Sequence, residues 1–426
     1  MPIAHFGRHS RMRAASCLVG RSPIRPAMGL RSSLYPFSSL PTYQYHSKQT
    51  FANGAPDHKP LGSLDRGTGY HIYHHSAPFK LDYGQNLPSF DLAYEVWGKL
   101  KYPIDLDRYF VVCANPLGSS FGSTAPQSIN PLTGKRYATD SRCFDLRHVH
   151  ASIGSSMGGM QSIAAAWLEP ERVHKVISIS GCGRTGRAGI AILLMADPNW
   201  KNGFYYDSAP PYLGMKLARQ VAAVTYGSGH EWERRFGKGL RSVTDEDGHS
   251  AIIPPTLKPE FSLETWLDHS AGQFSKIYDA NSWLYVSKAM ELFDMTAEGM
   301  NQLQQYRAPP LDESSSSDKA NCIPPEGVTN LSPSFCHHNV VASLSQTFGQ
   351  KYKSTHEFLI VGVQTDVLFP VASQRDLAEA IRSSASKHPD DQAPSVTYVE
   401  LDSPFGHDAF LIDLKAVGGA VKGFLA

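Results

Sequence analysis

The chain has 426 residues, enough for one large domain with an insertion or for two domains. Hydrophobic residues make up 41% of it and aromatic residues 11%. No apolar run approaches the roughly 18 residues of a membrane span. Its formal net charge of +1 divides unevenly, because residues 1–56 hold seven basic and no acidic side chains. The remaining residues, with 33 basic against 39 acidic side chains, carry a net charge of −6, which argues against nucleic acid as the main partner. Because no spanning run is present, we also expect no membrane partner.

The amino-terminal stretch, residues 1–56, has the composition of a mitochondrial transit peptide. It is rich in arginine and serine and lacks acidic residues, and it has no long apolar core of the kind that a secretory signal requires. We therefore expect a disordered segment, import into the mitochondrial matrix, and cleavage somewhere before Asp57.

The cysteines do not form a metal-binding or disulfide pattern. All six are scattered without a C-x-x-C pair, which is typical of free thiols in a reducing compartment. Neither the run Cys336-His337-His338 nor the pair His74-His75 has a matching second pair of ligands. The sequence therefore predicts no metal and no bound cofactor.

Short runs rich in β-branched and aromatic residues predict a largely parallel sheet. Residues 90–97 alternate in polarity, whereas residues 109–114 form a continuous apolar run, as expected of a strand buried on both faces. Later runs are separated by helical stretches, which is typical of βαβ units. The other predicted strands are 148–153, 174–180, 356–363 and 395–401, and the predicted core helices follow Ser156 and cover 371–384 and 409–425.

A different pattern occupies residues 193–340. Apolar residues recur there at helical spacing and aromatic residues are frequent, which predicts a helical insertion over the sheet. Within it, residues 308–334 are rich in proline and serine and predict a mobile surface loop.

One stretch has the form of a nucleophile elbow. The spacing Gly154-x-Ser156-x-Gly158 lies between a predicted strand and an alanine-rich predicted helix, the context in which a serine sits on a strained turn. Glycines on either side of the serine allow the strand and the helix to approach closely. The helix that follows would direct its free N–H groups at the site.

Two further residues complete a predicted catalytic triad. Asp366 and His407 each follow a predicted strand, and chemistry in open parallel sheets lies beyond the carboxyl ends of strands. The chain order Ser156, Asp366, His407 is that of α/β-hydrolases. His407 would activate the serine, and an acid would orient the imidazole ring. Asp402 and Asp408 are competing candidates for this orienting acid, but Asp366 follows the strand after which the fold places that acid.

Longer motifs make the resemblance more specific. The sequence contains GSSMGGMQ at 154–161, SINPLTG at 128–134, DANSWLYVSKAMELFD at 279–294, TDVLFP at 365–370 and FGHDAF at 405–410. Through these motifs most of residues 90–426 resembles the homoserine/serine O-acyltransferase family of the α/β-hydrolase superfamily. The run around Ser156 is most similar to the fungal mitochondrial branch that acylates serine for cysteine biosynthesis.

This resemblance implies an α/β-hydrolase fold with an inserted helical lid. The core would comprise residues 57–192 and 341–426, and the lid residues 193–340. The implied reaction is ping-pong acyl transfer from acetyl-CoA or succinyl-CoA to the hydroxyl of L-serine through an acyl-enzyme at Ser156, with acyl-CoA as a co-substrate. The family is commonly homodimeric.

The resemblance also assigns roles to residues around the triad. The N–H of Met157 would stabilise the oxyanion, and Leu117 is the nearest candidate for the second donor. Arg187 and Arg184 are candidates to bind the substrate carboxylate, and Asp408 is a further candidate for substrate binding.

The chain departs from the family in its core. The family has a strand between the segments that correspond to residues 90–97 and 109–114, but here only the polar run 101–108 joins them. The stretch 140–147 is too short for a full crossover helix, and residues 183–194 replace a longer helix of the family. We therefore expect some core elements to be missing and the activity to be impaired.

Three alternatives remain open. Homoserine O-acetyltransferase, of methionine biosynthesis, uses the same chemistry on a substrate one methylene longer, a difference worth only about 1–3 kcal/mol in a pocket. An ester or thioester hydrolase would use the same triad with an open lid. A non-catalytic binding protein would retain the fold without an oxyanion site.

Overall fold

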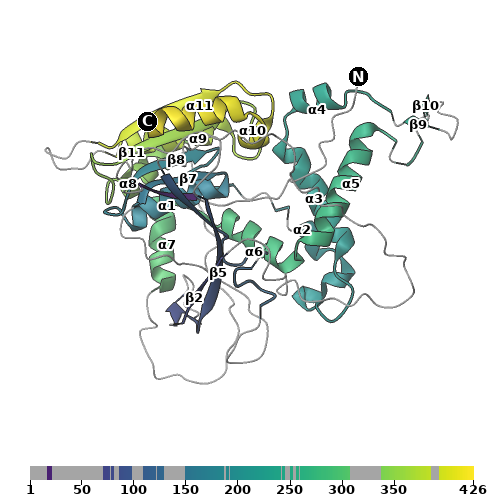
Figure 1. Cartoon of the computed structure of the whole chain (residues 1–426), viewed down its shortest axis with the longest axis horizontal. Helices are drawn as coiled ribbons and strands as arrows, with labels where there is room; N and C mark the ends of the chain where they lie inside the picture. The colour runs from purple at the N-terminus through teal and green to yellow at the C-terminus, as the bar shows by residue number, and fades with distance from the viewer. Residues whose placement is uncertain are drawn as a thin grey trace, which may run out of the picture.

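A computed structural model provides the structure of the chain (Figure 1). It describes residues 17–21, 71–76, 78–80, 86–97, 109–120, 122–128, 149–186, 189–190, 192–240, 242–244, 250–252, 256–258, 260–307, 337–384 and 393–426. The predicted loop at 308–334 and the crossover segment at 140–147 lie outside these residues.

An eight-stranded sheet forms the centre of the fold, in the order β12-β11-β8-β7-β1-β6-β5-β2. The four strands from β7 to β12 in this sheet are parallel, and the others pair antiparallel. The strands are β1 (Cys17–Arg21), β2 (His71–His75), β5 (Phe90–Trp97), β6 (Tyr109–Ala114), β7 (Val149–Ser155), β8 (Val173–Ile179), β11 (Glu357–Val363) and β12 (Ser395–Leu401). All six predicted strands are therefore present, with ends within two residues of the prediction. Two short hairpins, β3 (Phe79–Lys80) with β4 (Asn86–Leu87) and β9 (Ser242–Thr244) with β10 (Ser250–Ile252), were not predicted.

The position next to the nucleophile strand is filled by β1. This strand lies between β6 and β7 and runs antiparallel to both, with Val19 opposite Val111 on one side and Ala151 on the other. The expectation of a disordered stretch over residues 1–56 is wrong for Cys17–Arg21. The physical reason is that a short apolar run satisfies the backbone hydrogen-bonding groups of two neighbouring strands that would otherwise have no partner.

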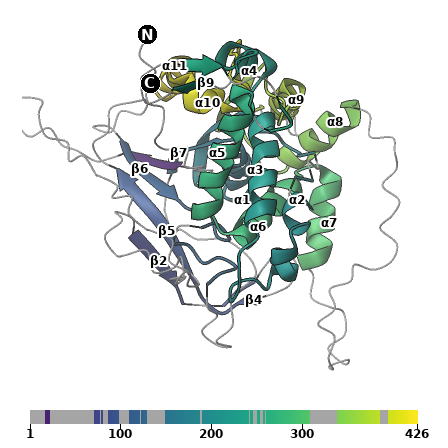
Figure 2. The same ribbon diagram turned by 90° about the vertical axis from the view of Figure 1, so that its right-hand side faces the viewer.

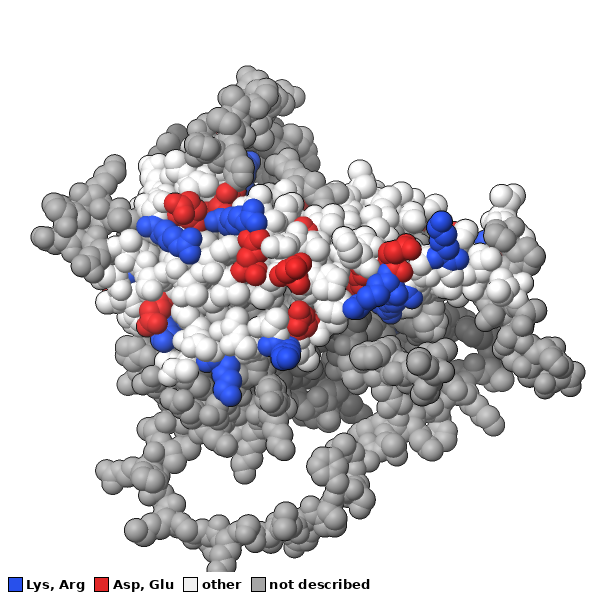
Figure 3. All heavy atoms as spheres, turned by 90° about the horizontal axis from the view of Figure 1, so that it is seen from above, with Lys and Arg blue, Asp and Glu red and all other residues white. Residues whose placement is uncertain are grey.

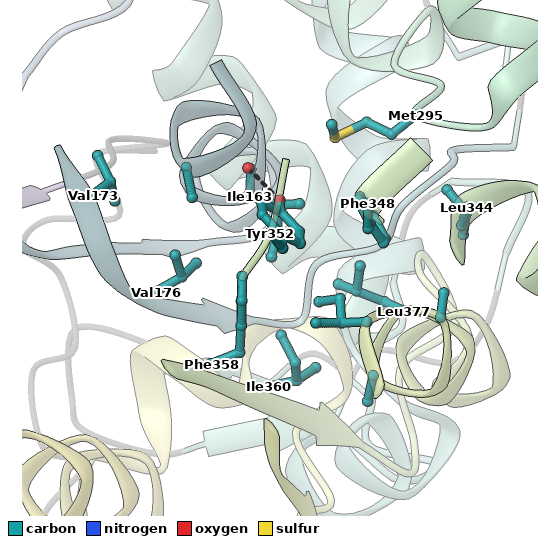
Figure 4. Close-up of a cluster of buried hydrophobic side chains, with 14 residues drawn as sticks. Ile163, Val173, Val176, Met295, Leu344, Phe348, Tyr352, Phe358, Ile360 and Leu377 are labelled. Atoms are coloured by element: carbon teal, nitrogen blue, oxygen red, sulfur yellow. Dashed lines mark hydrogen bonds between the residues drawn. The ribbon is translucent and has the colours of Figure 1, made fainter. Parts of the chain in front are cut away.

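Helices cover both faces of the sheet. On one face, three helices pack around Phe358 and Ile360 of β11: α1 (Met157–Leu168), α8 (His337–Phe348) and α9 (Val371–Arg382). In this cluster the Tyr352 hydroxyl donates a hydrogen bond of 2.8 Å to the Ile163 carbonyl (Figure 4). On the other face, α11 (Leu414–Leu425) packs against Leu359 and Val361. Alternate side chains of β11 therefore pack into the hydrophobic cores on opposite faces of the sheet, because successive side chains of a strand point to opposite sides.

The carboxyl-terminal helix is split in two. The apolar spacing predicts one helix over 409–425, but the structure contains α10 (Ala409–Ile412) and α11, separated at Asp413. The Asp413 carboxylate accepts a hydrogen bond from the Ala416 N–H, so this residue caps the second helix.

The insertion between β8 and α8 is mainly helical and lies to one side of the sheet (Figures 1 and 2). Its core packs α3 against α5, with Leu194, Met215 and Phe274 among the buried side chains. The Asp279 carboxylate accepts hydrogen bonds from the Tyr205 hydroxyl and the Ser282 N–H, which fixes the start of α6. The helices are α2 (Ile192–Met195), η2 (Pro198–Gly203), α3 (Tyr212–Tyr226), α4 (Gly229–Arg235), α5 (Ser262–Ile277), α6 (Ala280–Glu291) and α7 (Ala297–Arg307).

The surface shows no concentration of one charge on the face seen in Figure 3, where acidic and basic side chains are interspersed. Among the helices of the described residues, none has both the length and the apolar character that a membrane span requires.

His356, at the start of β11, makes stability depend on pH. Its side chain is 1% exposed, and burial lowers its pKa below 6.5. Because the unfolded chain binds the proton more readily, stability is lost as the pH falls through and below 6.5. We expect the wild-type protein to lose more free energy of unfolding than His356→Gln between pH 7.5 and 5.5, measured by urea denaturation. An equal loss in both proteins would contradict this prediction, and His174→Gln controls for the neighbouring ring.

Candidate active site

Ser156 occupies a strained turn between β7 and α1. Its backbone angles, φ 55° and ψ −126°, are rarely adopted by a residue other than glycine. The turn closes because a Cβ atom at Gly154 would lie only 2.0 Å from the carbonyl oxygen of Gly158, so no other residue fits there. The geometry is that of the nucleophile elbow expected from the sequence.

The structure brings the three predicted triad residues together, although they are separated by up to 251 positions. His407, in the short helix η3 (Gly406–Asp408), has its Nε2 atom 2.7 Å from Ser156 Oγ. The Nδ1 atom of the same ring lies 2.8 Å from an oxygen of Asp366. If Nδ1 donates to the carboxylate, Nε2 is left to accept from the serine hydroxyl, the arrangement that general-base activation requires.

Asp366 is held by donors from the following turn and helix. The Phe369 N–H donates to one carboxylate oxygen at 2.9 Å, and the side-chain amide of Gln374 donates to the other at 3.1 Å. Gln374 is completely buried and also bonds the Phe369 carbonyl and the Val363 N–H. Sequence reasoning missed Gln374; the only signal is its place one turn into the helix that follows Asp366.

Aromatic rings enclose the histidine. The edge of Phe369 approaches its ring with centroids 5.1 Å apart, and those of Phe410 and Tyr226 lie at 5.6 and 6.1 Å. His407 is only 3% exposed. These rings restrict access of water to the base, which matters for an acyl-enzyme that water could hydrolyse.

The two oxyanion candidates have different surroundings. Met157 is the first residue of α1, so its N–H has no acceptor within the helix and lies directly beside the nucleophile. Leu117 is buried with Leu87, Phe90 and Leu92, in a cluster separate from the one that contains Met157. Both oxyanion assignments stay predictions.

The surroundings of the two arginine candidates differ, and their role in substrate binding stays a prediction. Arg184 forms an ion pair with Asp294 at 3.1 Å, and Arg187 lies outside the described residues. A third arginine, Arg219 of α3, is 7% exposed, and its guanidinium lies 5.3 Å from the centre of the Tyr226 ring. It therefore places a buried cation beside the aromatic wall of the triad. The only feature of the sequence that points to Arg219 is its spacing of seven residues from Tyr226, which places both residues on the same face of α3.

Asp408 is close to this cation. Burial raises the pKa of its carboxyl group, while the positive charge of Arg219 acts in the opposite direction. Arg219 thus lies near His407 through the Tyr226 ring, and Asp408 directly follows His407 in the chain. An amino-acid substrate carries the complementary pair, an ammonium and a carboxylate.

A small hollow with a volume of about 30 Å³ lies between the lid and the core. Ala222 and Tyr226 of α3, Trp283 and Met290 of α6, and Leu368 are among the residues that line it. Tyr226 also faces His407, so the hollow adjoins the triad. Its lining is largely apolar.

A metal-binding cluster of three or more His, Cys, Asp or Glu side chains is not found in the part of the chain that the structure describes. His74 instead lies 2.7 Å from a carboxylate oxygen of Asp91. Cys182, buried beside Met160, has its pKa raised to about 12 by burial, so it is a poor nucleophile.

Comparison with known proteins places this geometry in context. The model of the α/β-hydrolase fold family matches residues 87–413. Serine O-succinyltransferase of Emericella nidulans is 37% identical, over 94% of this chain and 90% of its own length, and that of Schizosaccharomyces pombe is 34% identical, over 84% of each chain. The crystal structure of homoserine O-acetyltransferase from Bacillus anthracis, 19% identical, superposes with a TM-score of 0.60 over 84% of this chain and 97% of its own.

These comparisons confirm the predicted α/β-hydrolase fold class. They also bear on the core elements that the sequence predicts to be missing from this chain. The alignment with the Emericella nidulans protein runs over 482 positions, more than the 426 residues of this chain, so that relative has segments that this chain lacks. In the structure, β5 pairs directly with β6, and β1 stands beside the nucleophile strand.

Proposed function

Because the chain is an O-acyltransferase that belongs to the homoserine/serine O-acyltransferase family of the α/β-hydrolase superfamily, we propose that it transfers an acyl group from acyl-CoA to the hydroxyl of L-serine. The single observation that carries the proposal is the hydrogen-bonded relay from Asp366 through His407 to Ser156. The serine assignment is supported by the names of the fungal and bacterial relatives.

In the first half-reaction, Ser156 Oγ attacks the thioester carbonyl carbon while His407 Nε2 takes its proton. The tetrahedral intermediate, stabilised by the Met157 N–H, collapses with cleavage of the C–S bond, and His407 returns the proton to the leaving CoA thiolate. Asp366 orients the ring and stabilises the imidazolium that forms. The product of this step is an ester on Ser156.

In the second half-reaction, the hydroxyl of L-serine replaces CoA. His407 removes its proton, the new oxygen attacks the acyl carbon, and the Ser156 alkoxide leaves with the proton returned from the imidazolium. We expect parallel lines in steady-state plots. Lines that intersect would contradict a free acyl-enzyme.

Arg219 and Asp408 are proposed to bind the carboxylate and the ammonium of the acceptor. Arg219→Met keeps the aliphatic stem but removes the cation, so the KM for L-serine should rise by about 30- to 100-fold. Acyl-enzyme formation from acyl-CoA alone, measured by intact mass, should change little. An unchanged KM for serine would contradict the assignment, and a raised KM for succinyl-CoA instead would assign Arg219 to the donor.

The acyl donor is tested directly by product analysis. We propose the succinyl group, on the support of the relatives' names, with acetyl as the alternative. Mass spectrometry of reactions that combine L-serine or L-homoserine with acetyl-CoA or succinyl-CoA separates all four pairings. Acyl-CoA consumption that needs no amino-acid acceptor would favour the hydrolase alternative, and no consumption with any pair would favour a binding protein.

The cellular setting follows as a further proposal. O-acylserine production in the mitochondrial matrix, feeding cysteine biosynthesis, fits the composition of residues 1–56. Because β1 belongs to the sheet, we expect any processing to occur before Cys17, and sequencing of the mature amino terminus checks this. The homodimer also stays a prediction.

A further inference from the structure

The loop that carries His407 is held by a side chain of the neighbouring acid loop. Thr365, directly before Asp366, donates a hydrogen bond from its hydroxyl to the Ser403 carbonyl at 2.5 Å. The same oxygen accepts the N–H of Gly406 at 3.1 Å. One hydroxyl therefore bonds both ends of the segment that leads from β12 to the histidine.

The lid holds the same loop from the opposite side. Ser228, in the turn between α3 and α4, donates a hydrogen bond to the Pro404 carbonyl and accepts one from the Glu231 N–H at 3.0 Å. The contact is close, because a Cβ atom at Gly406 would lie 2.7 Å from the carbonyl oxygen of Tyr226. Gly406 also has a positive φ of 63°, which suits glycine at this point.

We propose that Thr365 and Ser228 are positioning residues. They hold the loop that carries His407 in place and so keep the His407 Nε2 atom within hydrogen-bond distance of Ser156 Oγ. This inference rests on the proposed function. The hydrogen bonds to Asp366 and Ser156 orient the imidazole ring, but the backbone of its loop is held by the two hydroxyls, one from the core and one from the lid. The seating of the lid on the core is thereby part of the catalytic apparatus.

The size of the effect follows from the geometry of proton transfer. His407 Nε2 and Ser156 Oγ are 2.7 Å apart, and a misplacement of about 1 Å can reduce a rate about 100-fold. Loss of either hydroxyl frees the carbonyl and amide groups that fix the loop. The consequence should appear in the activation of the nucleophile rather than in the binding of serine.

Thr365→Val tests this, because valine has the shape of threonine without the hydroxyl, and Thr365→Ser restores the hydroxyl. The probe is a fluorophosphonate, whose covalent reaction with Ser156 requires the base but no acyl acceptor. Labelling and kcat should fall by about 100-fold in Thr365→Val while the KM for L-serine changes by less than about threefold. Thr365→Ser should stay within about threefold of the wild-type protein.

The matched control is Ser384→Ala, which removes another buried hydroxyl, hydrogen-bonded to the Ile381 carbonyl and remote from the triad in the chain. It should label at the wild-type rate. If Thr365→Val melts below the assay temperature, Ser228→Ala carries the test, with Ser228→Thr as its rescue. Folded Thr365→Val or Ser228→Ala that labels as fast as the wild-type protein overturns the proposal, whereas a wild-type protein that is not labelled at all contradicts the proposed function instead.

Discussion

The Ser156→Ala variant is expected to lose acyl transfer by a factor of about 10⁴ to 10⁶ while keeping its fold. In the proposed mechanism, Ser156 supplies the oxygen that carries the acyl group between the two half-reactions, and His407 Nε2 lies 2.7 Å from that oxygen. Alanine removes the oxygen but adds no atom to the tight turn between β7 and α1. The rate that remains would come only from substrate binding and the Met157 N–H.

Two measurements separate this expectation from a general loss of structure. With acyl-CoA and no acceptor, the wild-type protein should gain the mass of one acyl group, and the variant should gain none. The melting temperature should stay close to that of the wild-type protein, because alanine keeps the Cβ atom and therefore the same backbone strain at φ 55°. Turnover by Ser156→Ala within tenfold of the wild-type rate would contradict the acyl-enzyme mechanism.

Disruption of β1 should have the largest effect on stability. Val19 pairs with Val111 on one side and Ala151 on the other, in the middle of the sheet. Proline at this position removes the backbone N–H and does not fit a central strand. Each buried backbone group left without a partner costs about 1–3 kcal/mol, and several together approach the roughly 5–15 kcal/mol by which a domain is stable.

We therefore expect Val19→Pro to show no cooperative thermal unfolding transition, whereas Val19→Thr, which keeps a β-branched side chain and the N–H, should melt within a few degrees of the wild-type protein. Circular dichroism and differential scanning calorimetry measure both. A Val19→Pro protein with the wild-type melting temperature would show that residues 17–21 do not contribute to the folded sheet. The core would then lack the strand beside β7, as the sequence predicts.

The predicted core and its triad came from local patterns. A continuous apolar run followed by Gln364-Thr365-Asp366 fixes both a buried strand and the edge at which its acid emerges. In the same way, the glycines around Ser156 specify a turn that only one backbone path allows. These inferences need no knowledge of distant residues, because the parallel strands all end at one edge of the sheet.

The position of Arg219 beside the triad could not be predicted from the local sequence. Along the chain it is an ordinary polar residue in an amphipathic helix, and nothing near it suggests substrate binding. Its place beside Tyr226 and Asp408 depends on how α3 crosses the core, which is set by packing with α5 and with the turn at Ser228. The ion pair of the candidate Arg184 with Asp294, at 3.1 Å, likewise left no trace in the local sequence.

By itself, the sequence determined six of the eight strands of the central sheet and the three candidates for nucleophile, base and acid, because these depend on periodicity, turn chemistry and strand ends. Only the tertiary structure decided that Cys17–Arg21 fills the position beside β7, that Gln374 holds Asp366, and that Thr365 and Ser228 hold the histidine loop. The physical reason is that a buried donor or acceptor takes whichever partner the folded chain brings to it, and that partner leaves no periodic trace in the sequence.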